Sequence, residues 1–198
     1  MRTGVAAAAL AMAGPADAQV VASGKAPGWY RFVLGHATVT VVSDGRAYSS
    51  DPKRTFSGAP PAAIDAAMQR RFLETDRVVL DENVVIVDFP GQCVMFDCGA
   101  GRSTLFGTDG GRLLGNLAAA SIPPASIDAI VLSHGHPDHI GALMDEAGRP
   151  NFPNAQLYLS EAEYVFWTDP ARTGSGLAAF HALALKQLAP NLGVDEIR

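Results

Sequence analysis

Ser133-His134-Gly135-His136-Pro137-Asp138-His139-Ile140-Gly141-Ala142-Leu143 is the stretch that decides the fold, and it holds three of the five histidines in a chain of 198 residues. Imidazoles crowded this closely repel one another when protonated, and when neutral each needs a partner for its ring nitrogens. A divalent metal supplies that partner, because imidazole nitrogen and carboxylate oxygen are both zinc ligands. The stretch therefore predicts a metal site and disfavours a polar loop with incidental histidines.

The spacing within this stretch predicts two pairs of ligands. His134 and His136 alternate, so their side chains point to the same side of an extended segment. Pro137 turns the chain, and Asp138 and His139 follow it. We expect His134 and His136 to face one metal, and Asp138 and His139 to face a second.

A short apolar run precedes the ligands. Residues 128–133 read Asp-Ala-Ile-Val-Leu-Ser, which is typical of a buried strand. Ligands that begin where such a strand ends lie at the edge of a sheet, a common place for active sites in α/β folds.

Other segments predict a hairpin, a further strand and helices. Residues 83–89 and 93–96 form the hairpin around a turn at 90–92. A strand over 39–42 ends at the turn Ser43-Asp44-Gly45, where Asp44 either faces the metal pocket or acts as an Asx-type turn residue. Residues 46–60 are expected to be irregular. Helices are expected over 61–73, 112–120 and 176–188, and from Ser160 onward.

Four details of these elements are open to test. Phe72 and Leu73 are expected either in the core or in a substrate wall. Ser160 and Glu163 have the form of a capping box, in which Glu163 reaches back to the start of the helix. His36 is interpreted as a turn residue, and His181 as a surface or rim residue.

The signature and its surroundings resemble a known family. His-x-His-x-Asp-His after an apolar strand, followed by Ile-Gly-Ala-Leu, resembles the metal-binding signature of the metallo-β-lactamase superfamily. Residues 94–99 are similar to the strand ending in Asp-x-Gly that precedes that signature. Residues 28–45, 152–158 and 161–167 resemble the branch that contains methyl parathion hydrolase and similar periplasmic hydrolases and lactonases. The resemblance runs from about Trp29 to the end of the chain.

This resemblance implies a fold and a reaction. The fold is α/β (α+β), mainly the N-terminal half of an αββα sandwich, with a mixed sheet and flanking helices. The reaction is hydrolysis of an ester, lactone or phosphotriester by a hydroxide shared between two divalent metals, zinc being the first candidate. His134 and His136 hold the first metal, and Asp138 and His139 the second. Asp138 also orients the nucleophile or passes a proton to the leaving group.

Asp97 is expected to support the metal loop without binding metal. Ligand histidines need an acceptor for their free N–H, and the resemblance implies that Asp97 is this acceptor. A turn carboxylate that binds backbone amides is an equally good interpretation.

Part of the family pattern is missing. The resemblance implies a third histidine, an aspartate that bridges the metals and a last histidine, and none of these motifs follows His139. We therefore expect a truncated chain that binds metal weakly, unless another chain, as in a homodimer, completes the ligand shells. Such a chain would hydrolyse substrates poorly and leave an apolar sheet face uncovered. The alternative is a non-catalytic remnant or a metal-binding half-domain without turnover.

Composition and the N-terminal sequence indicate the class of binding partner and the cellular location. A net charge of −5 argues against a nucleic-acid surface and leaves a small-molecule substrate, and no apolar run is long enough for a mature membrane span. Residues 1–18 have the order of a signal peptide, with cleavage after Ala16-Asp17-Ala18, which predicts a periplasmic or secreted domain over 19–198. Cys93 and Cys98 fall on opposite faces of a strand, so no bond between them is expected.

Overall fold

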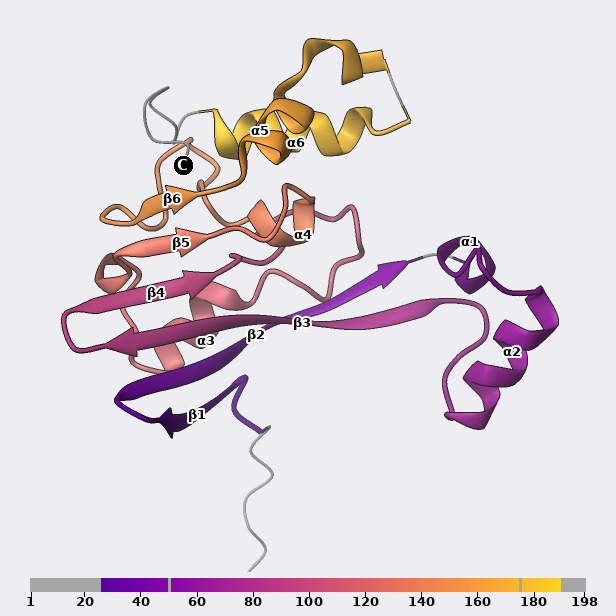
Figure 1. Ribbon diagram of the computed structural model, residues 1–198, viewed down its shortest axis with the longest axis horizontal. Helices are drawn as coiled ribbons and strands as arrows, with labels where there is room; N and C mark the ends of the chain where they lie inside the picture. The colour runs from indigo at the N-terminus through magenta and orange to yellow at the C-terminus, as the bar shows by residue number, and fades with distance from the viewer. Residues whose placement is uncertain (1–25, 50, 175, 190–198) are drawn as a thin grey trace, which may run out of the picture.

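The computed structural model describes residues 26–49, 51–174 and 176–189, and the predicted signal peptide lies outside them. Within the described residues, six strands form one sheet in the order β1-β2-β3-β4-β5-β6 (Figure 1). The strands are β1 (Trp29–Leu34), β2 (Ala37–Ser49), β3 (Val78–Phe89), β4 (Gln92–Phe96), β5 (Ala129–Val131) and β6 (Gln156–Tyr158). Strands β1 to β4 pair antiparallel, whereas β4, β5 and β6 pair parallel. This mixed sheet confirms the predicted α/β fold.

Helices flank the sheet and connect its strands. They are α1 (Pro52–Thr55), α2 (Pro61–Arg70), α3 (Leu113–Ala119), α4 (Pro137–Ile140), α5 (Glu161–Thr168) and α6 (Ala178–Leu188), with 3-10 turns η1 (Pro124–Ser126) and η2 (Pro170–Gly174). The predicted helices over 61–73, 112–120 and 176–188 are confirmed as α2, α3 and α6, each with shorter bounds. In the described residues, none of the helices is long and apolar enough to cross a membrane.

Strands β3 and β4 form the predicted hairpin, with Pro90 and Gly91 between them. After β4 the chain passes through α3 and returns as β5, which pairs parallel with β4 so that Phe96 lies opposite Val131. Parallel neighbours end at the same edge of a sheet. The residues that follow β4 and β5 therefore meet at that edge, and these include Asp97 and the signature loop.

The core lies on one face of the sheet. Alternate strand positions point to this face, and α3, α5 and α6 add apolar side chains to it. The fully buried members include Val42, Ile86, Met95, Leu113, Leu117, Ile130, Ile140 and Leu188. Burial of each such side chain contributes roughly 1.5–3 kcal/mol relative to leaving it exposed.

The predicted turn at residues 43–45 is wrong. Strand β2 continues to Ser49, and its register with β3 shifts between Ser43 and Gly45, which marks a β-bulge. A bulge accommodates one additional residue without ending the strand. The turn-forming residues of this segment therefore form a bulge within the strand. Helix α1 follows in the region where an irregular segment was expected.

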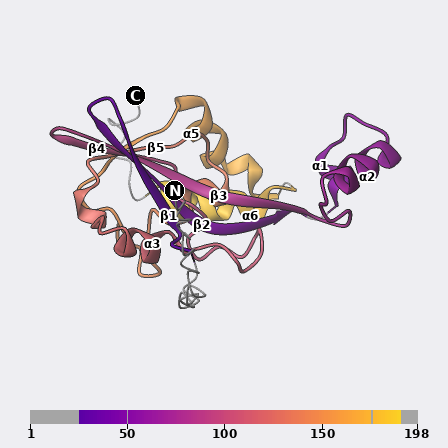
Figure 2. The same cartoon turned by 90° about the horizontal axis from the view of Figure 1, so that it is seen from below.

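The far halves of β2 and β3 form a two-stranded ribbon that carries α1 and α2 at its tip. Figures 1 and 2 both show this ribbon extending away from the rest of the sheet. Phe72, which follows α2, is 97% exposed and Leu73 is also exposed, so neither belongs to the core of this chain. The ribbon places α2 away from the signature loop, and the described residues give no substrate wall there.

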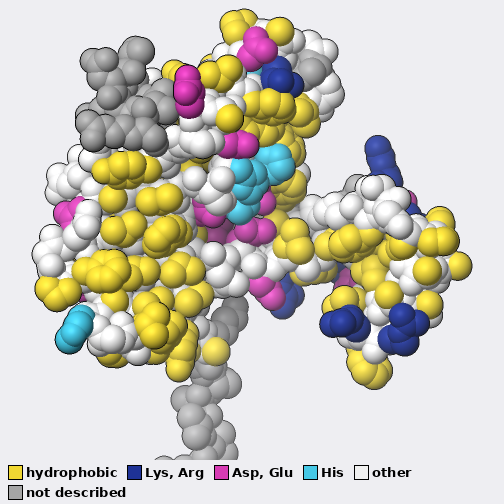
Figure 3. All heavy atoms as spheres, viewed as in Figure 1, with side chains coloured by type: hydrophobic (Ala, Val, Ile, Leu, Met, Phe, Trp, Pro, Cys, Tyr) yellow, Lys and Arg dark blue, Asp and Glu magenta, His cyan; other side chains and the backbone are white. Residues whose placement is uncertain are grey.

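The second face of the sheet carries large apolar side chains that remain exposed. Figure 3 shows hydrophobic side chains gathered over the strands on the face turned toward the viewer. The exposed side chains of β1, β3 and β4 include Tyr30, Phe32, Leu34, Phe89 and Phe96. Within the described residues these side chains remain open to solvent.

Candidate metal centre

The signature loop begins where β5 ends. Ser133 lies in a bend, and His136 is the N-cap of α4 with an extended backbone, φ −71° and ψ 151°. Pro137 occupies the first helical position, which suits its fixed φ. Asp138 and His139 follow in the first turn of the helix. The predicted change of direction at Pro137 is therefore produced by a helix start.

The three imidazoles of the loop lie together. The ring centroids of His134 and His136 are 4.5 Å apart, and those of His134 and His139 are 4.0 Å apart. The His134 ring lies nearer to His139 than to His136, so the three rings form one cluster and the division of the ligands into two pairs stays a prediction. Burial together with the neighbouring rings of His139 and His136 lowers the pKa of His134, which favours its neutral, metal-binding form.

Asp97 orients His139. Its Oδ2 lies 2.9 Å from Nδ1 of His139, and its Oδ1 also accepts the backbone N–H of Ser133 at 2.7 Å. Burial raises the pKa of Asp97, but the hydrogen bonds from His139 and Ser133 together outweigh it and hold that pKa below its usual range. An ionised carboxylate only accepts, so Nδ1 of His139 donates and Nε2 is directed elsewhere. Both interpretations of Asp97 from the sequence therefore describe contacts that it makes.

Asp138 faces the remaining nitrogen of His139. Its Oδ2 lies 3.5 Å from Nε2 of His139, and its Oδ1 is buried without a hydrogen-bond partner. Burial lowers the pKa of His139, but the carboxylates of Asp138 and Asp97 together raise it to about 10. A buried carboxylate oxygen without a partner is costly unless a cation binds it. The donor set of imidazole nitrogen and carboxylate oxygen thus fits a divalent metal at this position.

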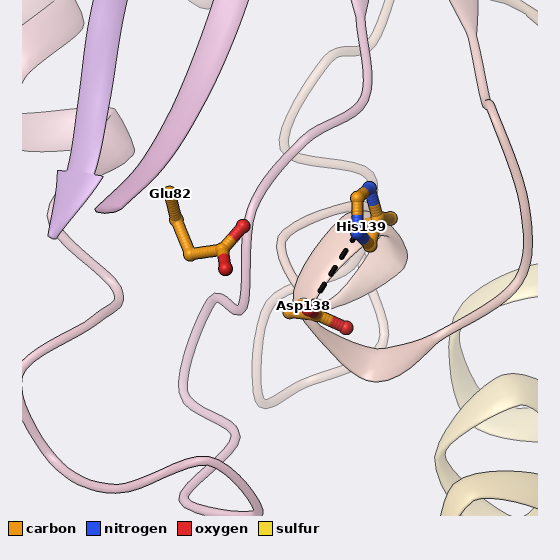
Figure 4. Close-up of side chains that lie close together, drawn as sticks. All are labelled: Glu82, Asp138 and His139. Atoms are coloured by element: carbon orange, nitrogen blue, oxygen red, sulfur yellow. Dashed lines mark ion pairs between the residues drawn. The ribbon is translucent and has the colours of Figure 1, made fainter. Parts of the chain in front are cut away.

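Glu82 reaches the same position from β3. One potential ligand atom each from Glu82, Asp138 and His139 lies within 4.8 Å of the others. Figure 4 shows the Glu82 carboxylate directed from its strand toward the other two side chains. Burial and the negative charge of Asp138 raise the pKa of Glu82. Glu82 was not predicted as a ligand, because nothing in the local sequence pattern around it marks it as one.

Glu163 fixes the signature loop from α5. Ser160 caps this helix as predicted, accepting the backbone N–H of Glu163 at 3.3 Å. The reciprocal half of the predicted capping box is wrong, because the Glu163 side chain turns to the loop. Its Oε2 accepts the N–H of Gly135 at 3.0 Å and the indole N–H of Trp167 at 2.9 Å. One carboxylate thereby ties the loop to the helix beside it.

Gly135 is required by the close approach of Trp167. A Cβ added at Gly135 would lie 2.3 Å from Cδ1 of that indole. The His136 ring then packs edge-on against Trp167 at 5.3 Å and against Phe180 of α6 at 5.5 Å. Two aromatic side chains therefore hold the orientation of a predicted ligand.

Asp44 supports the loops behind the centre. It is completely buried, and its carboxylate accepts the backbone N–H groups of Ala100, Gly111 and Leu113 at 2.8 to 3.0 Å. Its carboxylate also lies against Gly99, where φ is +69° and an added Cβ would lie 2.4 Å from the carboxylate carbon. Asp44 is therefore not an Asx-type turn residue, because its carboxylate binds distant N–H groups. Among the described residues it also does not belong to the group of potential ligand atoms within 4.8 Å of one another.

The remaining histidines and the cysteines are now placed. His36 lies in the β1–β2 turn and is exposed, as predicted. The prediction for His181 is wrong, because this residue of α6 is only 2% exposed. It shares the buried face of α6 with Ala184 and Leu188, three and seven positions later. Cys93 and Cys98 are free thiols, as expected.

A small cleft opens beside His134 and His136. It has a volume of about 210 Å³, and its other lining residues are Glu163, Phe166, Trp167 and Leu177. Oε2 of Glu163 accepts two N–H groups, and Phe166, Trp167 and Leu177 form the apolar part of the wall beside the two histidines. This wall suits an uncharged, partly apolar molecule.

A family model matches this part of the chain. The model of the metallo-beta-lactamase superfamily matches residues 77–180, which is more than half of the 198 residues. The match contains the hairpin β3–β4, the signature loop and α5. A search of curated proteins gave no match.

Several solved structures are similar to the chain. AidC, a dizinc quorum-quenching lactonase in complex with a product, is 24% identical with a TM-score of 0.73, over 86% of this chain and 61% of that chain. AbOPH, a hydrolase in the beta lactamase superfamily, is 26% identical with a TM-score of 0.75, over 88% and 61%. A quorum-quenching N-acyl homoserine lactone lactonase is 16% identical with a TM-score of 0.51, over 80% and 54%. The chain thus spans about three-fifths of the length of AidC and AbOPH.

Proposed function

The chain belongs to the metallo-β-lactamase superfamily, and from this premise we propose that it is a metal-dependent hydrolase. Its proposed substrates are uncharged esters, lactones or phosphotriesters. Zinc is the proposed metal, in two positions at the signature loop. When bound, such ions act as Lewis acids toward a carbonyl or phosphoryl oxygen and supply a water nucleophile near neutral pH.

One observation carries this proposal. Three imidazoles and two carboxylates meet at the edge where β4 and β5 end, and the buried Oδ1 of Asp138 has no partner. A loop with only a structural role does not explain this set of residues, because burial of an unpartnered carboxylate oxygen destabilises the fold. Bound cations satisfy these donors and offset the repulsion among the acids.

Each residue of the set has a proposed role. His134 and His136 bind one metal, and Asp138 and His139 bind the other. Asp97 accepts the Nδ1–H of His139 and so fixes both the tautomer and the ring orientation. Asp138 also holds the attacking water or passes a proton to the leaving group, since its carboxylate lies in this centre. The ligand histidines take no proton in this scheme.

The cleft favours the substrate class. Its aromatic and aliphatic wall lies directly beside His134 and His136, so an acyl or aryl group placed there brings the scissile bond to the metal. We propose a lactone or another uncharged ester as the first substrate to test, and a phosphotriester as the second. The residues that line this cleft include no Lys or Arg that could pair with a β-lactam carboxylate.

Turnover with and without metal tests this function. A chromogenic lactone and a chromogenic phosphotriester should be hydrolysed by zinc-loaded protein, though slowly because the further ligand motifs of the family do not follow His139, and a chelator should abolish the activity until zinc is restored. Asp138→Asn should lose at least about a hundredfold in kcat, the scale of a lost acid–base group. Full zinc loading without turnover of either substrate class would contradict the proposal and favour a metal-binding protein without catalysis.

We also propose export, from the signal-like order of residues 1–18. Mass spectrometry of the protein expressed with an intact N-terminus in a bacterial host should find a periplasmic form that begins at Gln19. Soluble protein that keeps Met1 throughout would contradict this proposal.

A further inference from the structure

We propose that Glu82 is a direct ligand of the metal held by Asp138 and His139. This inference rests on the proposed function, and it adds a ligand from outside the signature loop. It gives the second metal position three protein ligands, which is the usual number in catalytic zinc sites that keep one position open.

The register of the sheet brings Glu82 to the centre. The last pair between β3 and β4 is Val85 with Phe96, so β3 runs past the end of β4 at Glu82. Val84 and Ile86 are buried on the core face, and the two-residue period of a strand places Glu82 on that same face. The side chain therefore leaves β3 at the edge where the signature loop starts.

The β-bulge lies directly opposite. Glu82 pairs with Gly45, and the register shift falls between Ser43 and Gly45. Bulges near active sites redirect side chains by increasing the local twist. Here the bulge buries Asp44 beneath the loops, while Glu82 remains partly accessible and directed toward Asp138 and His139 (Figure 4).

Among the charges of the described residues that act on Glu82, that of His139 attracts it, but burial and the negative charge of Asp138 outweigh this attraction. No Lys or Arg of that part of the chain forms an ion pair with it, whereas the adjacent Asp81 pairs with Arg46 at 3.2 Å. Asp138, Asp44 and Asp97 all lie close enough to repel its charge. Carboxylates gathered in a partly buried place repel strongly, so the arrangement calls for a cation.

His139 and Asp138 offer two further ligand atoms for this cation at the same position. Nδ1 of His139 is bound to Asp97, so its Nε2 is the nitrogen turned toward Asp138. Oδ1 of Asp138 is buried and without a partner. A nitrogen and two carboxylates within 4.8 Å of one another match the ligand types of zinc and similar divalent ions.

The test isolates this second metal position. In a variant carrying His134→Ala and His136→Ala, only Glu82, Asp138 and His139 remain, and cobalt or zinc should still bind at one ion per chain. Adding Glu82→Gln should weaken that binding at least about tenfold and change the cobalt absorption spectrum. Adding Asp81→Asn is the matched control, since it removes one charge from the neighbouring strand position and should leave both readouts unchanged.

Each outcome decides between the two proposals. Equal cobalt affinity and spectra with Glu82→Gln and Asp81→Asn would overturn the Glu82 ligand and leave the proposed function intact. Loss of all metal already in the His134→Ala, His136→Ala variant would also overturn it. Wild-type protein without metal affinity would overturn the proposed function itself. Glu82→Asp, which keeps the carboxylate on a shorter stem, should fall between wild type and Glu82→Gln, and circular dichroism checks that all variants are folded.

Discussion

Nδ1 of His139 lies 2.9 Å from Oδ2 of Asp97, although the two residues are 42 positions apart in the chain. The contact exists because β4 and β5 are parallel neighbours that end at the same edge. Asp97 follows β4 with a positive φ of 60°, a conformation that aspartate tolerates better than most residues. The sheet thus connects the orientation of a predicted metal ligand to a carboxylate that directly follows the neighbouring strand.

Asp97→Asn should weaken metal binding without unfolding the protein. The amide retains the shape of the side chain but loses the charge that fixes the His139 tautomer. Loss of such a partner costs about ten- to a hundredfold in metal affinity. Competition with a chelating dye measures this change. Asp88→Asn, on the exposed end of β3, is the control, and an equal effect of both variants would contradict the assigned role.

Metal affinity should rise with pH. The carboxylates around His139 raise its pKa to about 10 in the metal-free protein, so a metal must displace a proton from Nε2 at neutral pH. Release of one proton makes the apparent affinity rise about tenfold for each pH unit between pH 7 and pH 9. Zinc titrations in buffers across this range provide the measurement, and a flat profile would contradict protonated His139.

The free energy of unfolding of the metal-free protein should decrease as the pH rises. The pKa of His139 is raised from an ordinary value of 6.5 to about 10 on folding. Its stabilising contribution is therefore complete below pH 6.5 and is lost as the pH rises through 10. Urea unfolding of chelator-treated protein at pH 7 and pH 10 should show this loss. His139→Gln should show a smaller decrease over the same interval.

Gly135→Ala should destabilise the protein and the metal site together. The added Cβ would lie 2.3 Å from Cδ1 of Trp167, so the loop or the indole must move. Overpacking of this kind costs about 1–3 kcal/mol, and it displaces the two histidines on either side. Gly115→Ala is the control, because that helical position is open and alanine there should stabilise by about 0.5–1 kcal/mol. Thermal unfolding of both variants tests the contrast.

Of the single substitutions proposed here, Asp44→Ala should lower the free energy of unfolding most. Truncation leaves the N–H groups of Ala100, Gly111 and Leu113 without their acceptor. Each unsatisfied buried donor costs about 1–3 kcal/mol, so a loss of at least about 3 kcal/mol is expected in urea unfolding. Asp88→Ala on the surface should change stability by about 0.5 kcal/mol or less. Similar values for both would show that the Asp44 carboxylate is not an anchor.

The elements that could be predicted are those with a local signal. The hairpin, the strand before the signature and the helices α2, α3 and α6 are each visible as periodicity or turn chemistry over a few residues. The bulge at Asp44 could not be predicted, because the residues Ser-Asp-Gly are equally suited to a turn and to a bulge. What distinguishes the two is the pairing with β3, which no local pattern contains.

Local pattern alone predicted the candidate site only where its residues are contiguous, and Asp97 was predicted through the family resemblance. His134, His136, Asp138 and His139 are clustered in the sequence, and the structure brings them together with Asp97. Glu82 lies 56 positions before Asp138 and is brought to the centre by register alone. Glu163 fits a capping box so well that its contact with Gly135 has no sequence signal. The prediction for His181 was wrong because the buried face of α6 includes polar as well as apolar positions.

The metal content of two matched proteins tests the proposed metal centre most directly. Wild-type protein and a variant with His134→Ala, His136→Ala, Asp138→Ala and His139→Ala would be loaded with zinc, desalted and measured by elemental analysis, with His36→Ala as the control for a histidine outside the centre. We predict that wild type and His36→Ala retain zinc and that the four-residue variant retains none. Equal zinc in wild type and the four-residue variant, whether high or negligible, would contradict the assignment of these residues as a metal centre.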